Sequence, residues 1–228
     1  MNEITYISLT TIPPRFENIG KTLECLLNQK AEIFEICLVI PKIYSRFPDW
    51  NGDLPQVPKG IKLLRCEKDL GPACKLFPTL HSIENIDSYV LYCDDDWEYQ
   101  PMWAQTFINN KLKNNSVIAS STFKVERLGK KNGSIVQGFG GVLVQKRFFT
   151  AEDYNIPSPY RWVDDIWIST CLRKNMISVE KNKQSKQFIK NGYRDNYELQ
   201  NTTFLTKKRA ELNLAAVNYS SERYKIWI

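Results

Sequence analysis

Short apolar runs recur along the first half of the chain. Residues 4–10 (ITYISLT), 35–41 (EICLVIP), 62–66 (KLLRC) and 89–93 (YVLYC) are rich in aliphatic, aromatic and β-branched side chains, and polar or proline-containing segments separate them. Runs of this length and composition are typical of strands that are buried on both faces. The pattern therefore predicts four β-strands in the first half.

Two of the segments between these runs predict helices. One covers residues 72–83 (PACKLFPTLHSI), which open on a proline, a residue favoured in the first helical turn. The other follows the first predicted strand. The alternation of strands and helices predicts an α/β domain with a mostly parallel sheet covered by helices on both faces. The helical spacing after the first strand is carried by Phe16, Ile19, Leu23, Leu26 and Leu27.

The second half repeats these patterns less regularly. Residues 102–112 (MWAQTFINNKL) and 163–175 (VDDIWISTCLRKN) predict helices, and the latter has acids at its start and basic residues at its end, as the helix dipole favours. Residues 116–123 (SVIASSTF) predict a strand, and 134–149 (SIVQGFGGVLVQKRFF) a strand interrupted by glycines. An amphipathic helix is predicted near 204–217 (FLTKKRAELNLAAV).

The composition is that of one folded domain with a basic C-terminal end. The chain has 228 residues, 43% of them hydrophobic and 25% charged. Its net charge of +6 is uneven, because residues 173–228 hold 12 Lys or Arg against 5 Asp or Glu. Such an end can contact anionic lipid, an anionic glycan or nucleic acid, or it can be a solvated surface.

Cysteine usage and hydropathy predict a cytoplasmic protein. No CxxC pair occurs, and most of the cysteines lie within apolar runs, which favours reduced and buried thiols. The first strand begins too early to leave room for a signal peptide, and no apolar run approaches the ~20 residues that span a bilayer. The six cysteines are Cys25, Cys37, Cys66, Cys74, Cys93 and Cys171.

Three consecutive aspartates follow the fourth predicted strand. In an extended backbone Asp94 and Asp96 point to one side and Asp95 to the other. Two converging carboxylates can hold a hard divalent cation such as Mg²⁺ or Mn²⁺, which would relieve their repulsion. A solvated acidic loop is the alternative, and the position at a strand end favours the metal.

Two other segments also follow predicted strands. In TTIPPR, the hydroxyls of Thr10 and Thr11 can bond a base or ribose and Arg15 a phosphate, although such residues often only cap a helix. In KDLGPACK, a Gly-Pro turn leads into a helix whose N-terminus, with Lys75, can hold a diphosphate, or Lys75 is an ordinary surface residue. Ligands of open α/β sheets bind beyond the carboxyl ends of the strands, so these segments are expected to share one crevice with DDDW.

The segment RWVDDIW carries the remaining candidate acids. Asp164 and Asp165 begin a predicted helix and lie between Trp162 and Trp167. Acids at this position commonly serve the helix dipole, whereas indole faces beside them favour stacking on a sugar ring. The GFGG run, residues 138–141, indicates either close approach of a ligand or a β-bulge.

The order SLTTIPPRF, DLGPACKL, VLYCDDDWEYQP, GFGG and WVDDIW resembles that of the GT-A glycosyltransferases, in particular bacterial and viral enzymes similar to the inverting family 2 group. The resemblance covers roughly residues 4 to 175. It implies a Rossmann-like GT-A domain over 1–180, followed by a basic C-terminal extension, 181–228, near the acceptor side. It also implies a metal-dependent, inverting transfer of sugar from a nucleotide sugar, with UDP favoured, to a glycan or glycolipid hydroxyl.

The resemblance also assigns roles to residues. It implies Asp94 and Asp96 as ligands of Mn²⁺ or Mg²⁺, and Asp165 as the general base with Asp164 in the preceding position of the pair. The implied partners are a nucleotide-sugar donor and a glycan or glycolipid acceptor, with peripheral membrane contact through the basic end and no nucleic acid. The implied nucleotide-binding residues are Thr10, Thr11, Arg15, Asp69, Lys75, Asp94 and Asp95, and the implied substrate-binding residues are Trp162, Gly140 and Gly141.

The sequence departs from the family pattern at three points. The acidic pair is Asp-Asp rather than Glu-Asp, the only histidine, His81, lies in a predicted helix, and the membrane spans of many relatives are absent. Two other functions stay open: a sugar-nucleotide nucleotidyltransferase, and a Ca²⁺-dependent carbohydrate-binding protein. The first normally has a glycine-rich basic loop after its first strand, which TTIPPRF lacks, and the second needs no nucleotide.

Overall fold

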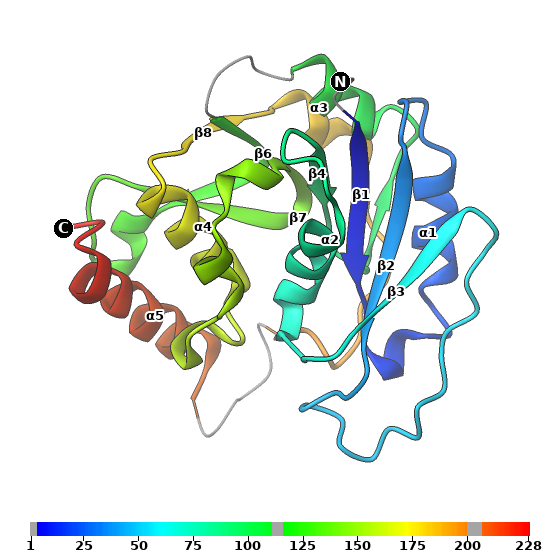
Figure 1. The fold of residues 1–228 in the computed structure, drawn as a ribbon, viewed down its shortest axis with the longest axis horizontal. Coiled ribbons are helices and arrows are strands. Elements are labelled where there is room, and N and C mark those ends of the chain that lie inside the picture. The colour runs from blue at the N-terminus through cyan, green and yellow to red at the C-terminus, as the bar shows by residue number, and fades with distance from the viewer. Residues whose placement is uncertain (1–3, 111–115, 200–206) are drawn as a thin grey trace.

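A seven-stranded sheet with the order β3-β2-β1-β4-β7-β6-β8 forms the centre of the computed structural model, which describes residues 4–110, 116–199 and 207–228 (Figure 1). The four strands predicted in the first half are all present and parallel to one another. They are β1 (Thr5–Thr10), β2 (Glu35–Pro41), β3 (Ile61–Cys66) and β4 (Tyr89–Tyr92).

The other half of the sheet contains one reversed strand. β7 (Ser134–Gln145) runs antiparallel to both β4 and β6 (Ser116–Lys124), and β8 (Ser178–Lys181) extends the edge parallel to β6. A second, two-stranded sheet pairs β5 (Trp97–Tyr99) with β9 (Ile189–Asn191). The mostly parallel α/β fold is thus confirmed, while β5, β8 and β9 are too short to stand out in the sequence.

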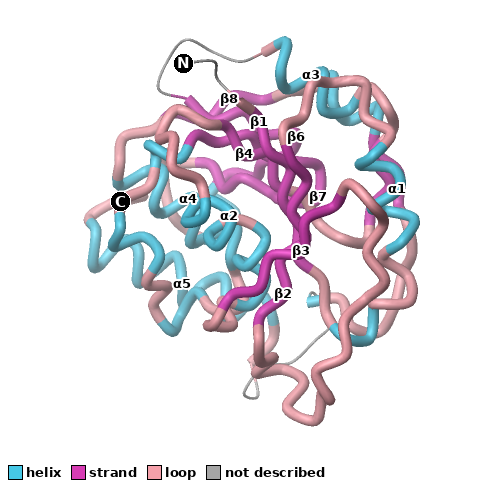
Figure 2. The backbone as a smooth tube through the Cα atoms, turned by 45° about the vertical axis from the view of Figure 1, so that its right-hand side comes forward, coloured by secondary structure: helices cyan, strands magenta, loops and turns pink. Residues whose placement is uncertain are grey.

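Helices cover both faces of the sheet (Figure 2). α1 (Gly20–Leu27) and α3 (Trp103–Asn109) lie on one face. α2 (Phe77–Ser82), α4 (Asp164–Lys174) and α5 (Arg209–Tyr224) lie on the other. Each face has its own hydrophobic core, as expected when both faces of a parallel sheet are covered.

The central strand β4 shows how the sequence builds both cores. Tyr89 and Leu91 pack into the core beneath α1 and α3, whereas Val90 and Tyr92 pack into the core beneath α2, α4 and α5. Successive side chains of a strand point to opposite faces, so an uninterrupted apolar run is needed where both faces are buried. The run YVLYC meets this requirement.

Prolines set the boundaries of two predicted helices. The first begins only at Gly20, because Pro13–Arg15 form a separate 3₁₀ turn. The second is divided into a 3₁₀ turn, Gly71–Lys75, and α2, in which Pro78 lies in the first turn and has no N–H to continue a preceding helix. Leu76, at the break, has non-helical dihedral angles.

The C-terminal part of the chain joins the same structure. β9 pairs with β5, and α5 packs against α4 with Ala216 and Val217 buried. α5 begins later and ends later than predicted, and residues 204–206 of that prediction lie outside the described residues. Among the helices of the described ranges, none has the length and apolar character of a membrane span.

The cysteines are unpaired, as predicted. All six are free thiols; Cys25 and Cys66 are half-buried and the other four are buried.

Candidate active site

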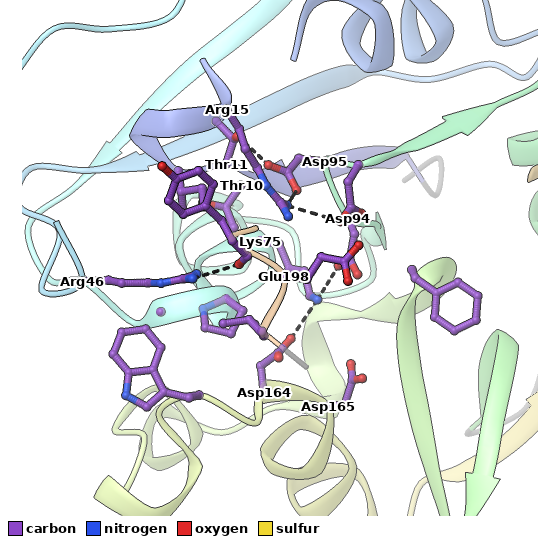
Figure 3. Close-up of a pocket in the computed structure, with 18 of the residues that line it drawn as sticks. Thr10, Thr11, Arg15, Arg46, Lys75, Asp94, Asp95, Asp164, Asp165 and Glu198 are labelled. Carbon is purple, nitrogen blue, oxygen red and sulfur yellow. Dashed lines mark hydrogen bonds and ion pairs between the residues drawn. The ribbon is translucent and has the colours of Figure 1, made fainter. Parts of the chain in front are cut away.

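The carboxyl ends of β1 and β4 and the segment after β3 border one cavity of about 630 Å³. The structure brings TTIPPR, KDLGPACK and DDDW together there, as the parallel strand order requires. The start of α4 closes one side, and residues from the C-terminal part of the chain close another. Figure 3 shows Thr10, Thr11 and Arg15 at one end, Asp164 and Asp165 at the other, and Lys75 between them.

Asp95 anchors the candidate nucleotide end of the cavity, where Thr10, Thr11 and Arg15 lie. Its carboxylate is buried and accepts hydrogen bonds from the Thr11 hydroxyl at 2.5 Å and from the Arg15 guanidinium at 2.6 Å. Its backbone carbonyl accepts a bond from Thr22 of α1 at 2.8 Å. The rest of the Arg15 guanidinium makes a two-pronged contact with Asp195, at 2.7 and 3.1 Å. Arg15 therefore ties the turn after β1 to the aspartate segment and to the C-terminal part of the chain.

Several candidate nucleotide-binding groups bond to the protein itself. The Thr10 hydroxyl donates to the backbone carbonyl of Val39 at 2.7 Å, and Thr11 and Arg15 are engaged by Asp95. Asp69 accepts bonds from the backbone N–H groups of Ser45 and Gly71, each at 2.8 Å. These four candidates line the cavity while shaping its wall.

Lys75 links the aspartate segment to the acidic pair. Its ammonium lies 2.6 Å from Asp94 and 2.8 Å from Asp164, and the side chain is almost wholly buried (Figure 3). Burial lowers the pKa of Lys75, but the charges of Asp164, Asp94 and Asp165 outweigh it and hold the pKa well above its ordinary value. Gly138 leaves room for this contact, because a Cβ there would stand 2.6 Å from the ammonium.

The pKa values of the two acids that open α4 are shifted in opposite directions. Burial would raise the pKa of Asp164, but the charges of Lys75 and Arg209 outweigh it and keep the pKa below its usual value. For Asp165, burial and the neighbouring Asp164 raise the pKa to about 7. The backbone N–H of Gly138 donates to Asp165 Oδ1 at 3.1 Å and fixes this carboxyl in place. A positioned carboxyl with a pKa near neutrality is suited to general base catalysis.

Asp94 and Asp96 have the donor chemistry for a hard cation. Both line the cavity with partly exposed carboxylates, of which 32% and 23% of the side chain is accessible. Burial and the charges of Asp94 and Asp95 raise the pKa of Asp96 to about 7. A divalent cation bound there would offset this electrostatic repulsion and lower the pKa. Arg15 is the nearest cation to Asp96, at 3.3 Å.

The described residues hold no group of three or more His, Cys, Asp or Glu side chains placed to bind a metal. Mg²⁺ is commonly held by one or two carboxylates, with substrate phosphates and water completing its shell, so a two-carboxylate site fits that ion.

The candidate substrate residues separate into two groups. Trp162 lines the cavity, whereas Gly140 and Gly141 do not. A Cβ at Gly141 would stand 2.5 Å from Trp103, and one at Gly140 2.7 Å from Ser120, so these glycines allow β7 to pack closely against the protein interior. The glycine of this run that approaches the site is Gly138.

Sequence reasoning missed the contribution of the C-terminal part of the chain. These residues belong to no motif, and only the pairing of β9 with β5 and the packing of α5 on α4 bring them to the cavity. The excess of basic residues after 173 was the one available indication. The missed lining residues of this part include Asn191, Tyr193, Arg194, Tyr197, Glu198, Arg209 and Asn213. Elsewhere in the chain, the missed lining residues include Tyr44, Arg46, Gln137 and Phe139.

Comparisons with known proteins give similarity of structure only. No family model and no curated protein matches the sequence. Among solved structures, a 2-C-methyl-D-erythritol 4-phosphate cytidylyltransferase from Francisella tularensis is 14% identical, with a TM-score of 0.47 over 79% of this chain and 90% of that one. Glucosyl-3-phosphoglycerate synthase from Mycobacterium tuberculosis, solved with Mg²⁺ and uridine diphosphate, is 12% identical, with a TM-score of 0.49 over 79% of this chain and 69% of that one.

A third similar structure is residues 1–349 of TarS from S. aureus, at 15% identity and a TM-score of 0.45, covering 80% of this chain and 59% of that one.

Proposed function

We propose that the protein is a GT-A glycosyltransferase that moves a sugar from a nucleoside diphosphate sugar, with UDP favoured, to an acceptor hydroxyl of a glycan or glycolipid with inversion. The observation that carries this proposal is the arrangement in one cavity of two partly exposed carboxylates, a buried lysine and a carboxyl whose pKa is about 7. The enzyme acts in the cytoplasm, and its basic C-terminal part contacts the membrane surface.

Each side chain has a distinct part in this reaction. Asp94 and Asp96 would hold Mn²⁺ or Mg²⁺, which supplies countercharge to a departing diphosphate. The ammonium of Lys75 adds positive charge beside Asp94 and keeps Asp164 ionised. Asp165 takes the proton of the acceptor hydroxyl as that oxygen attacks the sugar. Trp162 offers its indole face to a sugar ring.

Nucleotidyl transfer is the main competing reaction. It calls for a loop after β1 that grips a triphosphate, but here that turn contains Pro13 and Pro14, and its arginine is held by Asp95 and Asp195. This geometry supports sugar transfer over nucleotidyl transfer. The two activities give different products, because nucleotidyl transfer to a sugar phosphate releases pyrophosphate from UTP.

The pH dependence of transfer is expected to follow Asp165. A general base must be ionised, and burial together with Asp164 raises the pKa of Asp165 to about 7. The value of kcat/KM is therefore expected to fall about ten-fold for each pH unit below that pKa and to level off above it. Initial rates across the neutral range measure this. A flat profile, or one that declines as the pH rises through neutrality, would contradict the assignment.

A screen of nucleotide sugars tests the proposed activity. The protein is incubated with UDP-, GDP- and dTDP-sugars and Mn²⁺, and release of the nucleoside diphosphate is followed, with UTP plus sugar 1-phosphate as the competing pair. Metal-dependent release from one nucleotide-sugar class supports glycosyl transfer. Pyrophosphate release from UTP would instead establish nucleotidyl transfer, and no turnover or nucleotide binding would favour a carbohydrate-binding protein.

A further inference from the structure

One partly buried arginine of the cavity, Arg209, forms no ion pair with the described residues, although its charge acts on Asp164 and Asp165. Arg15 and Lys75 are each held by two or more carboxylates. Arg209 also lines the cavity, but among the described residues no carboxylate lies within ion-pair distance of it. Its Nη1 atom is buried and has no hydrogen-bond partner within residues 4–110, 116–199 and 207–228. Unpartnered buried donors are rare in proteins, and a guanidinium is expected to bind a carboxylate or phosphate.

Arg209 lies on the side of the cavity that holds the acidic pair. It is the first residue of α5, which packs against α4, the helix that begins with Asp164 and Asp165. Burial raises the pKa of Asp165, and the charge of Arg209 is among those that oppose this rise. Asn213 lies one helical turn after Arg209 and also lines the cavity. The two side chains thus form one wall close to the proposed base.

This wall is separate from the nucleotide end. Figure 3 shows Thr10, Thr11 and Arg15 at the end opposite Asp164 and Asp165. A hydroxyl that gives its proton to Asp165 must lie beside the acidic pair, which brings the acceptor within reach of Arg209.

We propose that Arg209 and Asn213 form a subsite for an anionic group, a phosphate or a carboxylate, on the acceptor sugar. The inference rests on the proposed function, because it takes the acceptor to bind beside Asp165. The planar guanidinium of arginine bonds two oxygens of either anion, and Asn213 offers an amide N–H to one of these oxygens or, in a phosphate, to a third. A neutral acceptor would leave Arg209 without its partner.

Calorimetric titration with simple sugars tests the subsite directly. The probes are glucose 6-phosphate, glucuronate and glucose, each titrated into the full-length protein with and without UDP and Mn²⁺. At least one anionic sugar is expected to bind about ten-fold or more tightly than glucose, because a hydrogen bond to a charged group contributes that much. The preference between the two anions shows whether the natural group is a phosphate or a carboxylate.

Substitutions test whether Arg209 and Asn213 cause the preference for anionic sugars over glucose. Arg209→Gln and Asn213→Leu are each expected to remove most of the anion preference while leaving UDP affinity unchanged. Arg223→Gln, at the exposed far end of the same helix, is the matched control and keeps the preference. Equal binding of glucose and both anionic sugars, or a preference that survives both cavity variants, would overturn the proposal. So would an Arg209→Gln variant that loses UDP binding, which would place Arg209 on the donor.

The proposed function is judged separately in the same experiment. UDP binding by the unmodified protein reports on the nucleotide site, whatever the sugars do. Failure of UDP to bind would count against glycosyl transfer. Failure of the anionic sugars alone would count only against the subsite.

Discussion

Asp165→Asn is expected to abolish sugar transfer while leaving nucleotide binding intact. An amide cannot accept the acceptor proton, and loss of general base catalysis typically lowers a rate by about 10²–10⁴-fold. The fold should survive, because the substitution keeps the shape of the side chain and removes a buried carboxyl whose ionised form is disfavoured, with its pKa raised to about 7. Single-turnover transfer and UDP titration on the same preparation measure both quantities.

Asp164→Asn is the matched variant for this prediction. Asp164 forms an ion pair with Lys75 at 2.8 Å, so its loss leaves a buried cation short of one partner. We expect lower stability and a partial loss of transfer, because Asp165 remains in place. If Asp164→Asn is inactive and Asp165→Asn retains transfer, the base is Asp164 and the assignment is wrong by one position.

Asp96→Asn is expected to abolish metal-dependent nucleotide binding. The variant removes one of two carboxylates available to the cation and leaves Asp94, which is itself paired with Lys75 at 2.6 Å. Thermal stability without ligand should be unchanged or higher, because burial and two neighbouring carboxylates raise the pKa of Asp96 to about 7 and its charge is disfavoured. Melting curves with and without UDP and Mn²⁺ check both expectations. Unaltered Mn²⁺ dependence in the variant would refute the metal assignment.

Asp95→Asn is the control for this result. This carboxylate is buried and bonded to Thr11 and Arg15 inside the protein, so its loss should destabilise the fold by on the order of 3 kcal/mol. The two adjacent substitutions are thus expected to differ: Asp96→Asn weakens metal-dependent nucleotide binding, and Asp95→Asn lowers the stability of the fold. Equal effects of the two substitutions on melting temperature would contradict the separation of roles.

The first half of the fold could be predicted because its signals are local. Each parallel strand is buried on both faces, so an apolar run such as EICLVIP marks it directly, and prolines mark where helices begin. β5, β8 and β9 could not be predicted in this way. They are three or four residues long, each with at least one charged side chain, and only their pairing partners define them.

The location of the site could be predicted from the sequence, but its internal hydrogen bonds and part of its lining could not. The topology of a parallel sheet places the segments after its strands in one crevice, which is why Asp94 and Lys75 could be named in advance, whereas Asp165 was named through the family resemblance. Which hydroxyl or guanidinium is already bonded within the protein depends on tertiary contacts. Arg15 illustrates this, since its partner Asp195 lies 180 residues away in the sequence. Arg209 could not be predicted for the same reason, since it reaches the cavity only because α5 packs on α4.

Calorimetric titration of the unmodified protein with UDP, in Mn²⁺ and again in excess EDTA, tests the central claim most directly. A nucleotide-sugar enzyme that holds its cation on Asp94 and Asp96 should bind one UDP per chain in Mn²⁺ and lose that binding when the metal is chelated. Absence of UDP binding in both conditions, or equal affinity in both, would contradict the account.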